Sequence, residues 1–296
     1  MIIDLPINSP LEEIFNPLFN LKEIELFIKR DDMIHPFISG NKWRKLKYIL
    51  QEAVALKKQH LVTFGGAHSN HLLATACAAA KFGFSSTGIV RGEPIESPTI
   101  FLSKLFGMQL IFEDRESYLD KNGLFKKHFN NNPNAYFIDE GGSGSLGAKG
   151  CSELIDELPE VFDHIFCAAG TGTTAAGILS GISSKSLNSK MHVVPVLKGA
   201  DFLKQDIENL VKGSFFEFHS AYHFGGYAKT SDELLKFIKD FTTSTGILID
   251  PVYTGKLLFA IYDLISKDYF ARGSRILMVH TGGTTGTLGM ANRFKL

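Results

Sequence analysis

The chain has 296 residues, of which 44% are hydrophobic, and its 31 basic side chains are balanced by 31 acidic ones. A net charge of zero gives no reason to expect nucleic acid or an anionic membrane surface as a partner, and no apolar run reaches the length of a membrane span. Length and composition are typical of a globular protein with one large domain or two smaller ones.

Three cysteines are present, Cys77, Cys151 and Cys167, and no two of them have C-x-x-C spacing. So few cysteines, in an odd number, argue against a disulfide framework and against a zinc site. The chain also begins without a basic segment followed by an apolar one, the pattern of a secretory leader. We therefore expect a cytoplasmic protein.

Short apolar runs alternate with longer amphipathic ones from about residue 25 onward. The periods of their apolar residues predict strands at 25–29, 60–64, 87–90, 108–112, 135–138, 164–169, 192–196, 247–249 and 275–280. They predict helices at 43–58, 70–82, from 97, 146–158, 173–184, 231–243 and 255–266. No internal repeat or low-complexity linker interrupts this alternation.

Alternating strands and helices predict an α/β fold with mostly parallel sheets. Glycine-rich turns follow several of the predicted strands, at 65–66, 141–144, 170–172 and 282–286. Ligands in such folds bind beyond the carboxyl ends of the strands, which is where these turns lie. We therefore expect a ligand site built from them.

One lysine, Lys42, stands apart because it follows Gly40 and Asn41 at the very start of a predicted helix. By itself a lysine at such a place is usually solvated. Together with several turns that can hold an anion, however, an amine nucleophile is what an enzyme needs to bind pyridoxal phosphate. The lysine would form a Schiff base with the aldehyde, and a glycine-rich loop at a helix N-terminus would hold the phosphate.

Ser69, Asn70 and His71 open the helix after the first glycine turn. Ser or Asn at such a place is often an N-cap. The alternative gives Asn70 a hydrogen bond to a cofactor and Ser69 a contact with substrate, and both interpretations can hold together. His68 and His71 have i, i+3 spacing, but no carboxylate or cysteine joins them, so we expect no metal site.

The run from Gly170 to Thr174 follows a strand and begins a helix. G-x-G-x-x-A after a strand is also a dinucleotide-binding pattern, which requires an acidic residue about 20 positions further on. Here the next strand ends without an acid until Asp201. The hydroxyls of Thr171, Thr173 and Thr174 suit a phosphate monoester, so we favour phosphate over a dinucleotide.

Two tyrosines beside glycines, Tyr227 and Tyr253, are the remaining candidates. Tyrosines at helix starts are more often packing residues, but a phenol in a closed site can stack, bind a carboxylate or pass a proton. The chain has no G-x-x-x-x-G-K-[ST] loop, no G-x-S-x-G elbow and no H-E-x-x-H pair.

Taken in order, these motifs resemble the 1-aminocyclopropane-1-carboxylate (ACC) deaminase / D-cysteine desulfhydrase family of pyridoxal-phosphate enzymes, which have the tryptophan-synthase-β-like fold (fold type II). The matches span nearly the whole chain: Lys29 to Asp32, Gly40 to Leu46, Gly65 to His71, Gly141 to Ser143, Gly170 to Thr174, Asp250 to Tyr253, and His280 to Gly283.

The resemblance implies a role for each matched residue. Lys42 would be the Schiff-base lysine and Asn70 would bond the ring hydroxyl of the cofactor. The phosphate would be held by Gly170, Thr171, Gly172, Thr173 and Thr174. The residues that would face the substrate are Ser69, Tyr227 and Tyr253.

The resemblance also implies two domains, each with a mostly parallel twisted sheet flanked by helices. The small domain would span 43–143 and the large one 1–42 and 144–296, with the cofactor in the cleft between them. The family is typically homodimeric, and its substrates are small amino acids.

Two positions separate the branches of the family. ACC deaminases carry Glu after the tyrosine of D-P-V-Y, beside the pyridine nitrogen, and Leu in the final H-L-G-G, whereas this chain has Thr254 and Thr281. A carboxylate there favours a protonated ring and a strong electron sink, which the opening of a cyclopropane needs. Elimination of a thiolate can proceed with a weaker electron sink, so D-cysteine is the first choice of substrate.

Alternatives stay open at this stage: ACC deamination, a non-catalytic pyridoxal-phosphate-binding protein, and a nucleotide-dependent enzyme. The chain also departs from the family at His68, where Gln is common, and in compact connections over 197–224. Both departures fall where they can change the substrate pocket.

Overall fold

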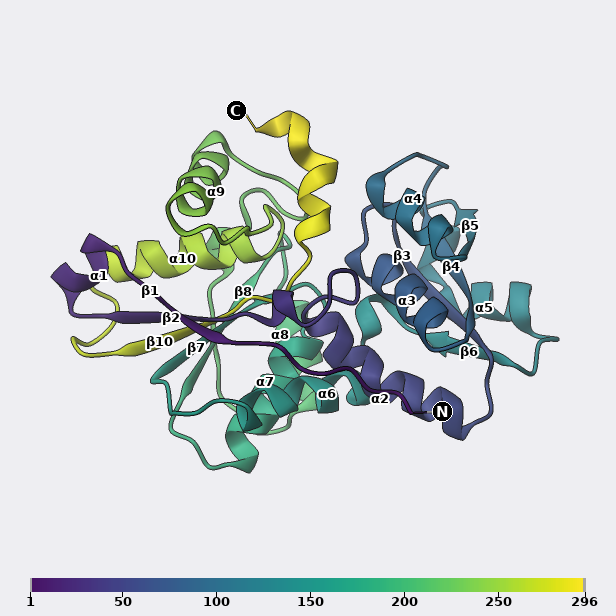
Figure 1. Cartoon of the computed structure of the whole chain (residues 1–296), viewed down its shortest axis with the longest axis horizontal. Coiled ribbons are helices and arrows are strands. Elements are labelled where there is room, and N and C mark those ends of the chain that lie inside the picture. Colours follow the sequence, from purple (N-terminus) through teal and green to yellow (C-terminus); the bar gives the residue numbers. More distant parts are fainter. Residues whose placement is uncertain (1, 295–296) are drawn as a thin grey trace.

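Two lobes make up the computed structural model, which describes residues 2–294 (Figure 1). Within these residues the larger sheet has the strand order β1 (Leu11–Ile14), β2 (Glu25–Lys29), β10 (Arg275–Val279), β7 (His164–Ala169), β8 (Lys190–Pro195) and β9 (Glu217–Phe218). Only β1 is antiparallel to its neighbour among these described strands.

The smaller sheet is parallel throughout. Its order is β5 (Gln109–Glu113), β4 (Ser85–Arg91), β3 (His60–Gly66) and β6 (Ala135–Ile138). The helices of this lobe are α3 (Asn70–Lys81), α4 (Pro98–Leu105) and α5 (Lys121–Phe129). The interior of β3 and of β4 is buried without alternation, as expected for strands covered on both faces.

Helices cover both faces of the larger sheet. Along β10, Ile276 and Met278 pack with the core that contains α9 (Asp232–Thr245) and α10 (Thr254–Ser266). Leu277 and Val279 point the other way, because side chains alternate along a strand, and pack with the core of α6 (Ser145–Asp156), α7 (Thr173–Ser184) and α8 (Phe202–Leu210).

The remaining elements are short. They are α1 (Pro17–Lys22) and the 3₁₀ helices η1 (Asp31–Met33), η2 (Ser117–Leu119), η3 (Glu140–Gly142), η4 (Ser220–His223) and η5 (Thr284–Arg293). No helix within residues 2–294 is long and apolar enough to cross a membrane.

Helix α2 (Asn41–Ala55) lies between the lobes and packs on both (Figure 1). Trp43, Leu46 and Leu50 belong to the core beneath the smaller sheet. The opposite face packs on α6, where a Cβ placed on Gly150 would lie 1.8 Å from the carbonyl oxygen of Arg44. The absence of a side chain at Gly150 thus lets the two helices approach closely.

The expectation of an α/β fold with mostly parallel sheets is confirmed. The expected strand at 247–249 is wrong: Ile247 and Ile249 are buried, but this segment has no strand partner among the described residues and packs from a loop between α9 and α10. The strands of the smaller sheet fall within 43–143, and the domain boundaries themselves stay a prediction.

Candidate active site

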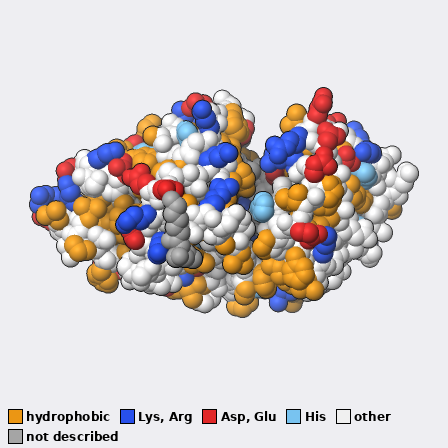
Figure 2. Space-filling model, turned by 90° about the horizontal axis from the view of Figure 1, so that it is seen from above, with side chains coloured by type: hydrophobic (Ala, Val, Ile, Leu, Met, Phe, Trp, Pro, Cys, Tyr) orange, Lys and Arg blue, Asp and Glu red, His pale blue; other side chains and the backbone are white. Residues whose placement is uncertain are grey.

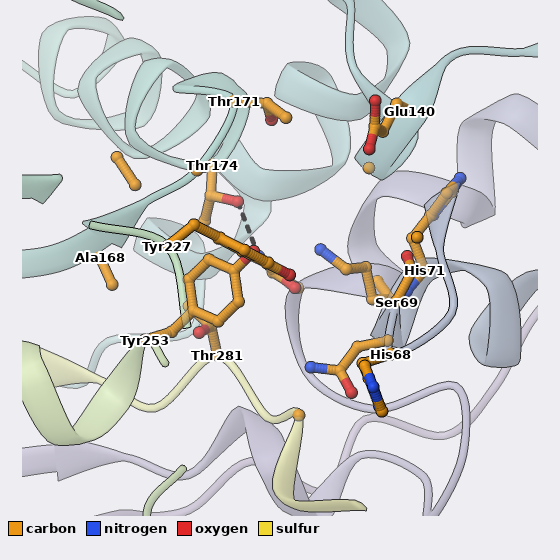
Figure 3. Close-up of a pocket in the computed structure, with 18 of the residues that line it drawn as sticks. His68, Ser69, His71, Glu140, Ala168, Thr171, Thr174, Tyr227, Tyr253 and Thr281 are labelled. Atoms are coloured by element: carbon orange, nitrogen blue, oxygen red, sulfur yellow. Dashed lines mark hydrogen bonds between the residues drawn. The ribbon is translucent and has the colours of Figure 1, made fainter. Parts of the chain in front are cut away.

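A cavity of about 580 Å³ opens where the carboxyl ends of both sheets face each other, and Figure 2 looks down on the hollow between the lobes. Most of the residues proposed from the sequence line it: Lys42, Ser69, Asn70, Gly170, Thr171, Gly172, Thr174, Tyr227, Tyr253 and Thr281. The two that do not line it are Thr173 and Thr254. Figure 3 labels Ser69, Thr171, Thr174, Tyr227, Tyr253 and Thr281 among the residues around the cavity.

Gly40 brings Lys42 to this cavity. Its φ is +59°, and a Cβ there would lie 2.1 Å from the carbonyl oxygen of Thr281. That oxygen accepts a hydrogen bond (3.3 Å) from the backbone N–H of Asn41. Only glycine fits both this conformation and this approach, so the start of α2 is held against the turn that follows β10.

The amine of Lys42 is largely desolvated at the cavity wall. Desolvation first, and then the positive charge of Lys45, lower the pKa of Lys42 to about 7. Lys45 is buried itself and donates a hydrogen bond (3.1 Å) to the carbonyl of Gly141. A substantial fraction of Lys42 is therefore neutral, and so nucleophilic, at neutral pH.

An anion cradle follows β7. Gly172 caps the N-terminus of α7 with φ +72° and no side-chain hydrogen bond, so the first N–H groups of the helix are left to another acceptor. Thr174 accepts a hydrogen bond (2.9 Å) from the Asn41 amide, drawn as a dashed line in Figure 3. Thr173 is fully buried, and its hydroxyl lies 3.0 Å from that of Ser143.

Ser69 and Asn70 face this cradle from the smaller sheet. Ser69 is the N-cap of α3, and its Oγ accepts from the N–H groups of His71 (3.2 Å) and Leu72 (3.4 Å). The side-chain oxygen of Asn70 is buried and has no hydrogen-bond partner within the described residues. A buried acceptor without a partner is costly, so Asn70 points to a ligand that supplies a donor.

The two tyrosines come from the larger lobe. Tyr253 lies against Gly170, and its ring centroid is 6.1 Å from that of Tyr227 (Figure 3). Desolvation raises the pKa of both phenols, so both are neutral at neutral pH. The loop before Tyr227 is held by Lys256, whose Nζ donates hydrogen bonds (both 2.8 Å) to the carbonyls of His223 and Gly226.

Thr254 is turned away from the cavity into the first turn of α10. Its hydroxyl donates to Oδ1 of Asp250 (2.8 Å) and accepts from the Asp250 N–H (2.8 Å). The Asp250 carboxylate also accepts the backbone N–H groups of Val252, Tyr253 and Thr254. The carboxylate nearest this wall is therefore occupied with capping a helix, while Thr281 lines the cavity.

Sequence reasoning missed several lining residues. Lys45 was given no role although it lies within the Gly40 to Leu46 match, and Arg91, Arg115 and Glu140 carried no motif. His71, which the sequence did single out, is buried, with Nε2 2.8 Å from the Thr63 hydroxyl and Nδ1 without a partner in the described chain. Arg91, Arg115 and Glu140 share one feature that could have identified them in the sequence: each stands at or just after the end of a parallel strand.

These features fit pyridoxal phosphate. An amine with a lowered pKa, an uncapped helix N-terminus with hydroxyls, and an unpartnered Asn70 oxygen match an aldehyde, a phosphate and a ring hydroxyl, respectively. The fold and the site together define a pyridoxal-phosphate-dependent enzyme.

Comparisons with known proteins agree. Residues 4–282 match the family described as "Pyridoxal-phosphate dependent enzyme". A putative ACC deaminase of Pyrococcus furiosus is 31% identical over 96% of this chain and 92% of its own length. The mitochondrial bifunctional D-cysteine desulfhydrase/ACC deaminase of Arabidopsis thaliana is 33% identical over 88% of this chain and 73% of its own.

A solved structure described as an ACC deaminase homologue superposes with a TM-score of 0.89 at 28% identity, covering 99% of this chain and 94% of its own. The chain belongs to the ACC deaminase / D-cysteine desulfhydrase family of pyridoxal-phosphate-dependent enzymes. It is thus a lyase of this type, and the non-catalytic and nucleotide-dependent alternatives are set aside.

Proposed function

We propose that this enzyme eliminates the β-substituent of a D-amino acid, with D-cysteine as the first choice of substrate, to give pyruvate, ammonia and hydrogen sulfide. One observation carries the proposal: the cavity wall formed by Tyr253 and Thr281 offers no free carboxylate among the described residues. Asp250, the acid closest in sequence, is occupied by the N-terminus of α10.

This wall favours elimination over ring opening. A hydroxyl such as that of Thr281 carries no charge, so it cannot stabilise a protonated pyridine nitrogen as a carboxylate would. A neutral ring is the weaker electron sink. Loss of a thiolate from Cβ proceeds with a weaker sink, whereas opening a cyclopropane that lacks an α-hydrogen requires a stronger one.

Different residues of the chain would transfer the α-proton, bind the substrate carboxylate and donate to the leaving group. Bound pyridoxal phosphate supplies the electron sink that acidifies the α-hydrogen. Lys42 Nζ, partly neutral near pH 7, is placed to accept that proton. Ser69 Oγ already accepts two N–H bonds, so its own O–H is free to donate to a substrate carboxylate. The neutral phenols of Tyr227 and Tyr253 are donors for the departing sulfur.

Release of 2-oxo acid from D-cysteine, L-cysteine and ACC, measured in parallel, tests the proposal. We expect rapid pyruvate release from D-cysteine alone. Lys42→Ala should reduce turnover by about two to four orders of magnitude, because both the covalent anchor and the base are lost. Wild-type-like turnover in Lys42→Ala would rule out this mechanism.

ACC deamination is the second candidate, because relatives from Pyrococcus and Thermotoga are named putative ACC deaminases. It predicts that Thr254→Glu combined with Thr281→Leu improves a trace of 2-oxobutanoate release from ACC. Efficient release of 2-oxobutanoate by the wild type would show that the argument from the ring nitrogen is wrong.

We also propose a homodimer in the cytoplasm. Phe101 and Leu105 of α4 and Leu288 of η5 are exposed on elements that pack together, as side chains of a subunit interface are in an isolated subunit. The three cysteines are unpaired, which suits a reducing compartment. Light scattering on the purified protein should give twice the mass of 32.7 kDa.

A further inference from the structure

Two arginines in the cavity wall have no acidic partner within the described part of the chain. Arg91 ends β4 and Arg115 follows β5, and both side chains are exposed on the cavity. No hydrogen bond or ion pair joins either guanidinium to the rest of residues 2–294. The other arginines all donate hydrogen bonds to acidic groups or to a backbone carbonyl: Arg30, Arg44, Arg272, Arg275 and Arg293.

The Arg91 guanidinium is positioned rather than free. It lies over the ring of Tyr118, 5.6 Å from the centroid. Its Nη2 is 3.8 Å from where a Cβ of Gly66 would be, on the turn that leads to Ser69. Stacking on a ring leaves the N–H groups at the edge of the guanidinium available to an acceptor in the cavity.

The described residues that line the cavity offer this pair little negative charge. Glu140 is the single carboxylate among the described residues that line the cavity, and Lys121 pairs with it at 3.3 Å. Two guanidiniums thus remain without a neutralising partner on this wall. Both basic and acidic side chains are visible on the rim of the hollow in Figure 2, so it is the lining and not the rim that is poor in acid.

The two arginines come from a different sheet than the cofactor cradle. The cradle and the two tyrosines come from the larger lobe, whereas Arg91 and Arg115 follow strands of the smaller sheet, as does Ser69. A group bound between the arginines would therefore belong to the outer end of the substrate, beyond its α-carboxylate.

We infer that Arg91 and Arg115 form a subsite for an anionic group, such as a carboxylate, at the far end of the substrate side chain. This inference rests on the proposed function, and it widens the substrate class from D-cysteine to D-cysteine S-conjugates that end in a carboxylate. Planar guanidiniums suit a carboxylate because they can offer paired N–H donors.

The reaction on such a conjugate balances without another reactant except water. With S-carboxymethyl-D-cysteine, the α-proton passes to Lys42 and the Cβ–S bond breaks, so that the sulfur leaves with the electron pair as mercaptoacetate. Water then completes the release of pyruvate and ammonia. Nothing is oxidised or reduced overall.

Two substrates that differ only in charge test the subsite: S-carboxymethyl-D-cysteine and its neutral amide, S-carbamoylmethyl-D-cysteine. We expect wild-type kcat/KM for pyruvate release to favour the carboxylate by about tenfold. The double variant Arg91→Gln/Arg115→Gln should bring the ratio close to one. Arg272→Gln, a surface arginine paired with Glu23, is the control that should keep the wild-type ratio.

A ratio near one in the wild type, or a ratio that survives in the double variant, would overturn the subsite. Weaker pyridoxal-phosphate binding in the double variant with an unchanged ratio would also overturn it, because the arginines would then serve the cofactor phosphate. That affinity is measured by titrating the cofactor-free protein.

A binding measurement separates this inference from the proposed function. D-2-aminoadipate has a terminal carboxylate and no leaving group, so its binding, followed by the change in cofactor absorbance, does not depend on elimination. Tighter binding than that of its side-chain amide, abolished in the double variant, supports the subsite even if no substrate releases pyruvate. Equal binding of the two would reject the subsite even if D-cysteine is turned over.

Discussion

Lys42 combines a reactive side chain with a place in the wall of a cavity, and its amine is the part of the site most sensitive to pH. Because desolvation lowers the pKa of Lys42 to about 7, the neutral amine that attacks an aldehyde is abundant at physiological pH. An exposed lysine titrates near 10.4, where capture of an aldehyde at neutral pH is slow.

We therefore expect the rate of pyridoxal-phosphate capture by the cofactor-free protein to rise with pH through a midpoint near 7. Stopped-flow absorbance at several pH values measures this rate. A surface lysine peptide is the control, with its midpoint near 10. A midpoint above 9 in the protein would show that Lys42 is solvated and charged before the cofactor arrives.

The sequence predicted which turn residues lie at the cavity, but it did not predict which groups bind the hydroxyls of the nearby threonines. Gly170 to Gly172 had to stand at the carboxyl edge of a parallel sheet, so their arrival in the cavity follows from the fold class. Whether Thr173 faces the cavity depends on Ser143, 30 residues away, and no local pattern encodes that pair. Thr254 is the converse case, because Asp250 four residues earlier caps the same helix and takes the hydroxyl.

At the scale of elements, the turn before α2 is under the tightest steric control. Gly40→Ala would place a methyl group 2.1 Å from the Thr281 carbonyl in a left-handed backbone conformation. We expect a loss of about 2 to 4 kcal/mol in the free energy of unfolding, together with weaker cofactor binding, because the start of α2 must shift.

Gly107→Ala is the matched control for Gly40→Ala. Its φ is +83°, but nothing lies within 4 Å of the added methyl group, so it should cost only about 1 kcal/mol and leave cofactor affinity unchanged. Urea unfolding and cofactor titration measure both quantities. Equal losses in the two variants would mean that the contact with Thr281 is not what fixes Lys42.

A buried ion-pair network fastens α2 to the larger lobe. Arg44 donates to Asp31 (2.6 and 2.7 Å) and to Glu157 (2.8 and 2.9 Å), and the Arg44 and Asp31 side chains are only 2% and 1% exposed. Arg44→Met leaves the Asp31 carboxylate buried without its partner, so we expect a loss of about 3 to 5 kcal/mol in unfolding free energy.

Lys47→Met is the control for Arg44→Met on the same helix, because the ion pair of Lys47 with Glu153 is partly exposed. It should cost less than about 1 kcal/mol. Thermal or urea unfolding of the cofactor-free variants compares them. A loss from Arg44→Met as small as that from Lys47→Met would show that the network contributes little to the attachment of α2.

Long helices with a clear helical period of apolar residues were predicted well from the sequence, whereas short or exposed helices and strands were not. The helices at 173–184 and 255–266 match α7 and α10 closely, because long apolar faces mark them. The edge strands β1 and β9 were not predicted, because strands of four and two residues are too short to show a clear alternation of apolar and polar side chains. The false strand at 247–249 has the apolar residues of a strand, but burial against helices accounts for them equally well.

Across the whole molecule, one feature of the larger sheet ties its stability to pH. His164, His192 and His219 form a chain over β7, β8 and the end of β9, with ring nitrogens 2.8 and 2.9 Å apart. Desolvation, followed by the neighbouring His164 and His219, lowers the pKa of His192 to about 2, so the buried ring stays neutral in the folded state.

Unfolding releases His192 to its ordinary pKa of about 6.5, so below that pH the unfolded chain binds a proton that the folded chain does not. Stability is then fully present above pH 6.5 and falls as the pH decreases. Between pH 6.5 and 5 the expected loss from His192 alone is about 2 kcal/mol. Urea unfolding of the cofactor-free protein at a series of pH values measures it.

His192→Leu should flatten this dependence, since an apolar side chain of similar size binds no proton. The comparison is between slopes, so a uniform loss of stability in the variant does not obscure the result. A slope in His192→Leu as steep as that of the wild type would assign the pH dependence to other groups.

The two walls of the cavity are built by loops that follow strands of different sheets, and this arrangement has an evolutionary consequence. Apart from Asn70, which begins α3 after a strand of the smaller sheet, the residues that would hold the cofactor follow strands of the larger sheet or begin α2, whereas Ser69, Arg91 and Arg115 follow strands of the smaller one. A mutation at a strand end of the smaller sheet can thus alter the substrate while Lys42 and its anchoring turn keep their places. Descendants of one ancestral gene can acquire new substrates in this way, one loop at a time, without first losing the cofactor on which any activity depends.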